Sequence, residues 1–279
     1  MSKRKWHELE ELTEIQEDIC DFPYTVDYVK EHGISCDTCD REVVQTWQPC
    51  ELMKNTDGKI YWRAGKHETG IHWHVAPDRV QTSMGEFVNE NHGEFGGELV
   101  TPFGETVEGN FEGIIEWSGN VYAAESLNHF GPSHCRVVEF QPDGSNNCLF
   151  AYGLAAIVTK AMIMDEEPCL EMGAWYVTDE ALFFLCGGYR QQNDGTLASE
   201  SHLIKVTQNK AEETDVFDFC YGEISSIIVE DSTLYIGLNK ELVVVDRESK
   251  AVKRYTFMTE EECTALREGN ERMLKLLGW

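Results

Sequence analysis

The sequence predicts an all-β fold that is built from repeated antiparallel sheets, with a helix at each end of the chain. Three stretches share one pattern: an apolar strand, a polar turn, a strand with an aromatic residue near its start, a variable loop and a further apolar strand. These stretches begin at Ile114, Trp175 and Ile227. They recur about every 50 to 60 residues, and repeats of this size stack because none of them can bury its faces alone.

The repeat predicts a small β-propeller-like fold of about four or five blades. Short strands with a period of two run from about Lys59 to Tyr255, separated by turns that are rich in Gly, Asn, Asp and Ser. One of these strands is expected over Gln81–Val88. A succession of short strands without long helices between them indicates antiparallel sheets, and the period suits four-stranded blades. A β-sandwich or a barrel would also have many short strands and stays the alternative.

Helices are expected at the two termini. Apolar residues recur at intervals of three and four over Lys5–Ile19, which places them on one face of a helix. Near the other end, Thr259 and Glu262 form a capping-box pattern, and an apolar stripe follows it. We therefore expect a single domain over residues 1–279, with a helical N-terminal segment (1–35), a β body (56–257) and a C-terminal helix (259–278).

The chain is strongly acidic. Its 279 residues include 50 Asp and Glu but only 23 Lys and Arg, which gives a formal net charge of -27. Such a charge repels nucleic acid and anionic membranes, whereas it attracts a basic partner and accelerates the encounter with it. No apolar run approaches the roughly 20 residues that a membrane-spanning helix needs, and no apolar segment follows the basic start, so a cytoplasmic protein is expected.

The motifs do not predict a catalytic site, a metal or a cofactor. Cys36 and Cys39 form a CxxC pair, but a zinc site needs two further ligands at a suitable spacing. His72 and His74 would share one face of a strand, where they could contribute to a metal site. Both metal hypotheses stay open. The sequence contains no nucleophile elbow, zinc-protease motif or phosphate-binding loop, which favours a protein without catalytic activity.

Three loops are the best candidates for a binding site, because each follows the aromatic-bearing strand of one repeat. They are rich in Gly, His, Asn and aromatic residues. In a propeller, equivalent loops emerge on one face, and loops on a rigid scaffold commonly carry binding residues. The candidate partner-binding residues are His92, Glu94 and Phe95 in the first loop, His129 and Phe130 in the second, and Tyr189 and Arg190 in the third.

The stretch from Asn91 to Leu99, which reads Asn-His-Gly-Glu-Phe-Gly-Gly-Glu-Leu, resembles a group of bacterial cytosolic propeller-like proteins, as do the repeats that follow it. Some members of this group are similar to immunity proteins of polymorphic toxin systems. The resemblance spans about Gly70 to Tyr255, and it implies a binding protein that occludes the active site of a cognate toxin. The acidity of the chain makes a basic toxin, such as a nuclease, the expected partner.

Two other functions stay open. A small propeller hydrolase or lactonase would hold a metal at the propeller centre, and bound calcium or zinc after purification would identify it. A scaffold or sensor without catalysis would bind a partner that is unrelated to any toxin.

Overall fold

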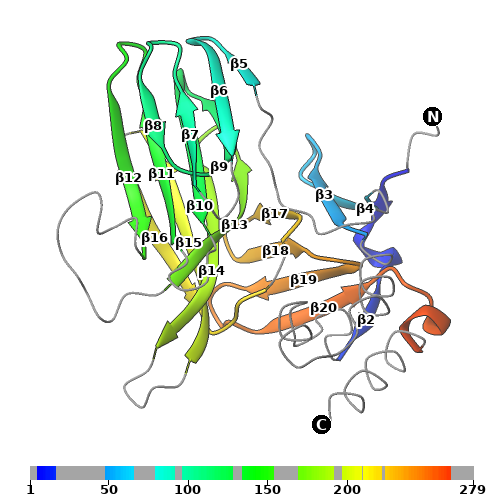
Figure 1. The fold of residues 1–279 in the computed structure, drawn as a ribbon. Helices are drawn as coiled ribbons and strands as arrows, with labels where there is room; N and C mark the ends of the chain where they lie inside the picture. The colour runs from blue at the N-terminus through cyan, green and yellow to red at the C-terminus, as the bar shows by residue number, and fades with distance from the viewer. Residues whose placement is uncertain are drawn as a thin grey trace, which may run out of the picture. The chain divides into compact units, whose positions relative to one another are not determined.

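The computed structural model describes residues 5–16, 48–65, 79–91, 96–127, 134–153, 169–191, 197–208, 210–221 and 224–264. These residues form antiparallel sheets, most of them four-stranded, which confirms the predicted all-β class (Figure 1). The chain divides into two compact units. Unit 1 comprises Met1–His72 and Gly222–Trp279, and unit 2 comprises Trp73–Tyr221.

The described residues of unit 2 form three four-stranded sheets, in each of which the strands follow one another in sequence order. Each sheet is thus an up-and-down meander, which is the repeat that the sequence predicts. The first sheet contains β5 (Arg79–Thr82), β6 (Gly85–Asn91), β7 (Gly97–Val100) and β8 (Thr106–Glu108). The middle sheet contains β9 (Phe111–Trp117), β10 (Asn120–Leu127), β11 (His134–Phe140) and β12 (Asn146–Tyr152). The third sheet contains β13 (Cys169–Val177), β14 (Leu182–Gln191), β15 (Leu197–Thr207) and β16 (Lys210–Phe217).

The single strand expected over Gln81–Val88 is in fact a hairpin, so this prediction is wrong. The Thr82 side chain makes the turn: its hydroxyl donates to the Gly85 carbonyl (2.9 Å) and accepts from the Met84 amide (3.2 Å). Gly85 has a φ of 123°, a backbone conformation that residues with a Cβ rarely adopt. A threonine that caps a turn in this way is also a good strand former, so periodicity alone does not separate the two roles.

Apolar cores lie on both sides of the middle sheet of unit 2. One core joins this sheet to β5–β8 and includes Phe87 and Phe140, whose rings meet edge to face with 5.4 Å between centroids. The other core joins it to β13–β16 and includes Tyr122 and Phe184. Strand β10 is therefore buried on both faces, which explains its almost continuous run of apolar residues.

The described residues of unit 1 form two sheets. One has the order β1-β4-β3, and the other has the order β17-β18-β19-β20-β2. The strands are β1 (His7–Glu8), β2 (Thr13–Ile15), β3 (Cys50–Lys54), β4 (Ile60–Ala64), β17 (Ser226–Val229), β18 (Thr233–Gly237), β19 (Glu241–Asp246) and β20 (Val252–Thr256), and a short 3-10 helix, η1 (Leu9–Glu11), lies between β1 and β2.

The predicted N-terminal helix is wrong over residues 5–16, and residues 17–19 lie outside the described residues. These twelve residues, here called the strap, pair with the edge of β4 through β1 and with the edge of β20 through β2. The Trp62 indole donates to the Glu8 carbonyl (3.0 Å) and stacks on His7 with 5.0 Å between ring centroids. Pairing with two sheet edges satisfies the strap backbone and prevails over the weak intrinsic preference of a short isolated helix.

The predicted C-terminal helix is described only at its start, where residues 260–264 are helical. The capping box is present there: the Thr259 amide donates to the Glu262 carboxylate (2.8 Å), and the Glu262 amide donates to the Thr259 hydroxyl (3.2 Å). The remainder of the range 259–278 lies outside the described residues. No helix in the described part of the chain has the length and apolarity to cross a bilayer.

We expect Gly237→Ala to destabilise unit 1 by about 3 kcal/mol or more, because an added Cβ has no room. It would overlap the backbone carbonyl oxygen of Cys50 and lie 2.5 Å from the Ser226 hydroxyl. Gly58→Ala is the matched control: it meets nothing within 4 Å but has a φ of 87°, so it should cost only about 1 to 2 kcal/mol. Urea unfolding followed by near-UV circular dichroism measures both variants, and equal losses would contradict the tight junction of β3 with β18.

Candidate functional site

The structure describes two of the predicted partner-binding residues, Tyr189 and Arg190, and both lie near the end of β14. Tyr189 is 51% exposed, which is high for a large aromatic side chain. The other five predicted residues, His92, Glu94, Phe95, His129 and Phe130, lie outside the described residues. So do the candidate metal ligands Cys36, Cys39, His72 and His74.

The strands that flank the three predicted loops all end at one edge of unit 2, here called the loop end. It is defined by the strand termini Asn91, Gly97, Leu127, His134, Gln191 and Leu197. Neighbouring sheets are aligned at this edge, because the Met172 amide at the start of β13 donates to the Ser126 hydroxyl near the end of β10 (3.0 Å). At the opposite edge the strands are joined by tight turns, and the Trp117 indole donates to the Thr178 carbonyl (2.7 Å).

At the loop end, the core between the first two sheets becomes polar. Glu125 is only 4% exposed, and it accepts a hydrogen bond from Arg136, whose guanidinium also donates to the Glu108 carbonyl. His134 Nε2 lies 3.4 Å from the same carboxylate. Gly109 makes room for this group, since an added Cβ would lie 2.5 Å from the Glu125 carboxylate.

Two buried polar atoms at this place have no hydrogen-bond partner within the described part of the chain. They are Nδ1 of His134 and Oδ1 of Asn89. The Asn89 amide nitrogen donates to the Phe111 carbonyl (3.0 Å), which fixes the direction of its oxygen. Both atoms could accept a hydrogen bond from a group that donates into this layer.

The core between the second and third sheets also ends in a charged network. His202, which is buried, lies between two carboxylates: Nε2 is 2.9 Å from Glu200, and Nδ1 is 2.6 Å from Glu213. A protonated imidazolium can donate to both. Tyr152 on β12 donates to Glu213 (2.8 Å), so the network links two sheets.

This network fixes Arg190. Its Nε donates to both oxygens of Glu200, at 2.9 and 3.2 Å. Burial acts to raise the pKa of Glu200, but hydrogen bonds from Arg190 and His202 outweigh burial and hold that pKa below its usual value. Arg190 is therefore pre-organised on β14. It is next in sequence to the exposed Tyr189, and the two side chains face opposite sides of the sheet because successive residues of a strand alternate.

A third acidic feature of the loop end is Glu112, on the first strand of the middle sheet. Burial, reinforced by the negative charge of Glu171 on β13, raises the pKa of Glu112 to about 8. This carboxyl group therefore carries a proton over much of the neutral range, which would allow it to donate a hydrogen bond or a proton.

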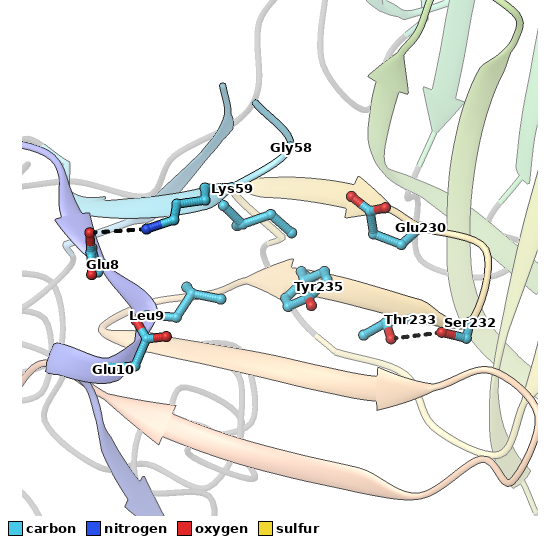
Figure 2. A pocket seen from close by; sticks show the side chains of 10 residues that line it. Glu8, Leu9, Glu10, Gly58, Lys59, Glu230, Ser232, Thr233 and Tyr235 are labelled. Atoms are coloured by element: carbon cyan, nitrogen blue, oxygen red, sulfur yellow. Dashed lines mark hydrogen bonds and ion pairs between the residues drawn. The ribbon is translucent and has the colours of Figure 1, made fainter. Parts of the chain in front are cut away.

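Unit 1 contains a separate acidic pocket of about 410 Å³. Three segments that are distant in sequence form its walls: the strap, the β3–β4 turn and the β17–β18 hairpin (Figure 2). The lining residues are Glu8, Leu9, Glu10, Gly58, Lys59, Ile60, Glu230, Ser232, Thr233 and Tyr235. Sequence reasoning missed this pocket because it placed the strap in a helix and found no motif in the other two segments.

Carboxylates dominate the charge of the pocket. The Lys59 ammonium lies 3.6 Å from the Glu8 carboxylate, and both side chains are more than half exposed. Lys54 pairs with Glu230 at 2.6 Å. Burial, together with the charge of Glu230, raises the pKa of Tyr235, so its hydroxyl is neutral at physiological pH.

No protein-family model and no curated protein matches this sequence. Among solved structures, a mutant of the apocarotenoid oxygenase of Synechocystis matches with 11% identity and a TM-score of 0.34, over 76% of this chain and 56% of that chain. A Bacteroides fragilis protein assigned as a 6-phosphogluconolactonase matches with 9% identity and a TM-score of 0.25, over 78% and 83%. Both are β-propeller proteins. At these identities and TM-scores, neither match indicates what this chain binds or catalyses. The chain spans little more than half the length of the oxygenase.

Proposed function

We propose that this chain is a cytoplasmic immunity protein that binds a basic toxin and occludes its active site, and that the loop end of unit 2 is the binding face. The observation that carries the proposal is that Tyr189 is exposed and that the next residue, Arg190, has its guanidinium held by Glu200. Tyrosine and arginine are the residues that most often dominate binding energy at interfaces. Fixing the Arg190 side chain before binding reduces the conformational entropy that association loses.

The four-stranded meanders are, on this proposal, propeller blades that hold the loops in place. A rigid scaffold suits an inhibitor, because the contact residues need no rearrangement when the toxin docks. The net charge of -27 would attract a basic toxin over distances of several ångströms and increase the association rate. The few aromatic and arginine contacts would then determine how long the complex lasts.

The double variant Tyr189→Ala/Arg190→Ala is expected to weaken toxin binding by about a hundredfold, the loss typical of two central interface residues. Val177→Ala is the matched control, because Val177 is 44% exposed at the opposite edge of the same sheet. Surface plasmon resonance with the purified toxin measures both. If the double variant and the control bind alike while both stay folded, the loop end around β14 is not the binding face.

A catalytic role is the second candidate, and Glu112 is the observation that favours it. A carboxyl group with a pKa of about 8 could act as a general acid near neutral pH. In that case Glu112→Gln would abolish turnover of a lactone or ester substrate. Turnover that is unchanged in Glu112→Gln would exclude this residue as the acid.

A further inference from the structure

We propose that the polar layer between the first two sheets of unit 2 binds a primary carboxamide, which a partner protein presents on an asparagine or glutamine side chain. The polar layer comprises Asn89, Glu125, His134 and Arg136, and it lies at the loop end. This inference rests on the proposed function in taking the loop end as the binding face, and it adds the chemical group that the partner inserts there.

One series of contacts joins the side chains of the polar layer. The Asn89 amide nitrogen donates to the Phe111 carbonyl (3.0 Å), and Phe111 pairs with Glu125 across strands β9 and β10. The Glu125 carboxylate accepts from Arg136 and lies 3.4 Å from His134 Nε2. A side chain of the first sheet and three of the middle sheet therefore meet in one layer.

The polar layer presents two buried acceptor atoms. Nδ1 of His134 and Oδ1 of Asn89 have no hydrogen-bond partner among the described residues, which are only 8% and 3% exposed at these two positions. An ionised carboxylate only accepts, so the His134 nitrogen that faces Glu125 carries the proton of a neutral ring and leaves the Nδ1 lone pair as an acceptor. Because unpaired buried polar atoms cost free energy, a ligand that donates to them is bound more favourably than it would be at the surface.

The charge of the polar layer favours an uncharged ligand. Its one buried carboxylate, Glu125, already has the Arg136 guanidinium as its cation. A lysine or arginine side chain from a partner would add a second cation next to Arg136, which is unfavourable where the charges are buried. A metal ion is also disfavoured, because in the part of the chain that the structure describes no three His, Cys, Asp or Glu side chains converge to hold one.

The two acceptors then select the chemical group. Among uncharged side chains, only those of asparagine and glutamine carry two N–H donors on one nitrogen. A hydroxyl, an indole or a backbone amide donates once and would leave one acceptor unpaired. The carbonyl oxygen of the same carboxamide can accept from Arg136, whose Nη1 makes no hydrogen bond to a described residue.

The space in the polar layer suits a small group. An added Cβ at Gly109 would lie 2.5 Å from the Glu125 carboxylate, so the backbone already lies close to that side chain. Arg136 leads from this buried place towards the surface, since its guanidinium also donates to the carbonyl of Glu108, an exposed residue at the end of β8. A flat carboxamide on a flexible stem fits this narrow place better than a ring would.

Three short peptides test the inference on the full, isotopically labelled chain without any toxin. They are acetyl-Gly-Gln-Gly-N-methylamide, its dimethylglutamine counterpart, which lacks both side-chain donors, and its methionine counterpart, which lacks the carboxamide. We expect the glutamine peptide to shift the nitrogen NMR signal of His134 Nδ1, because that lone pair accepts a hydrogen bond, and the side-chain amide signals of Asn89. The other two peptides should leave these signals unchanged.

Paired variants test the contribution of the amide acceptor. Asn89→Leu should weaken binding of the glutamine peptide about fivefold, the loss expected for one neutral hydrogen bond. Asn147→Leu is the matched control, because Asn147 is exposed on β12 of the same unit, and it should change binding less than about twofold. Thermal unfolding verifies the fold of both variants. If Asn89→Leu does not fold, the His134 signal of the unsubstituted chain decides the question.

A His134 signal that the glutamine peptide leaves unchanged, an equal shift with either control peptide, or equal losses in the two variants would overturn the inference. The test is also separable from the proposed function. If the glutamine peptide binds here and no toxin binds the chain, the carboxamide site is retained and the immunity function is contradicted. If a toxin binds while the His134 signal stays unchanged in the complex, only the carboxamide site is contradicted.

Discussion

Arg136→Met is expected to destabilise unit 2 by about 3 to 5 kcal/mol, because it leaves the buried carboxylate of Glu125 without its cation. Glu125 is 4% exposed, and Arg136 joins it to the Glu108 carbonyl on the neighbouring sheet. Methionine keeps much of the hydrocarbon stem, so the loss reports the charge and its hydrogen bonds. Chemical denaturation followed by near-UV circular dichroism measures it.

Two further variants make this prediction specific. Arg79→Met breaks an ion pair whose two side chains are 64% and 46% exposed, and it should cost less than about 1 kcal/mol. Glu125→Gln/Arg136→Met removes both charges and should recover part of the loss of Arg136→Met. If Arg136→Met lowers the free energy of unfolding no more than Arg79→Met does, the contact of Arg136 with Glu125 and the Glu108 carbonyl does not stabilise the packing of these two sheets.

Glu112→Gln is expected to change how stability depends on pH. The pKa of Glu112 rises from an ordinary 4.5 to about 8 in the folded chain, chiefly through burial. Between these values the folded state holds a proton that the unfolded state has released, so the free energy of unfolding falls as pH rises. The stabilisation is complete below about pH 4.5 and is lost as pH rises through about 8.

Glutamine is neutral at every pH and has nearly the same shape, so Glu112→Gln should remove this decline. Above pH 8 the variant should be more stable than the parent chain by about 3 to 5 kcal/mol, at about 1.4 kcal/mol per pKa unit. Glu180→Gln changes an exposed carboxylate in the same unit and is the control for the general charge. Parallel pH profiles for the parent chain and Glu112→Gln, measured by urea unfolding from pH 5 to 9, would show that Glu112 is not a protonated buried group.

The β class and the repeat could be predicted from the sequence because both depend on local patterns. Strands such as β18 and β19 have dense β-branched and aromatic residues between clear turns. Strand β16 (Lys210–Phe217) could not be predicted in this way, since half of its residues are charged. Pairing with β15 makes it a strand, and that pairing is a long-range property.

The strap is the converse case: local patterns predict a helix there, and long-range pairing makes it extended. Trp6, Leu9, Leu12 and Ile15 have helical spacing, but their burial comes from contacts with two sheets: the Trp6 ring, for example, lies 4.4 Å from the Arg63 guanidinium carbon. The apolar spacing correctly indicates which side chains are buried, but it does not indicate whether a helix or an extended segment buries them. Short segments of this kind follow their tertiary partners and not their intrinsic preference.

The candidate sites divide in a similar way. Tyr189 and Arg190 can be predicted from the equivalence of the loops between repeats, which is visible in the sequence. Glu200, which holds Arg190, and His202, which contacts Glu200, are two apart on β15 and carry no recognisable motif. The pocket of unit 1 could not be predicted from the sequence, because it depends on bringing residue 8 together with residues 59 and 230.

The central claim is that this acidic chain binds a basic toxin, and co-purification with the polypeptide encoded immediately upstream tests it most directly. The tagged chain and that polypeptide are expressed together and purified at low salt, and the association rate of the separated partners is then measured at increasing salt. The account predicts a one-to-one complex with a basic polypeptide whose association slows steeply as salt rises, since screening weakens long-range attraction. Absence of a complex at low salt, with both proteins folded, would contradict the immunity function.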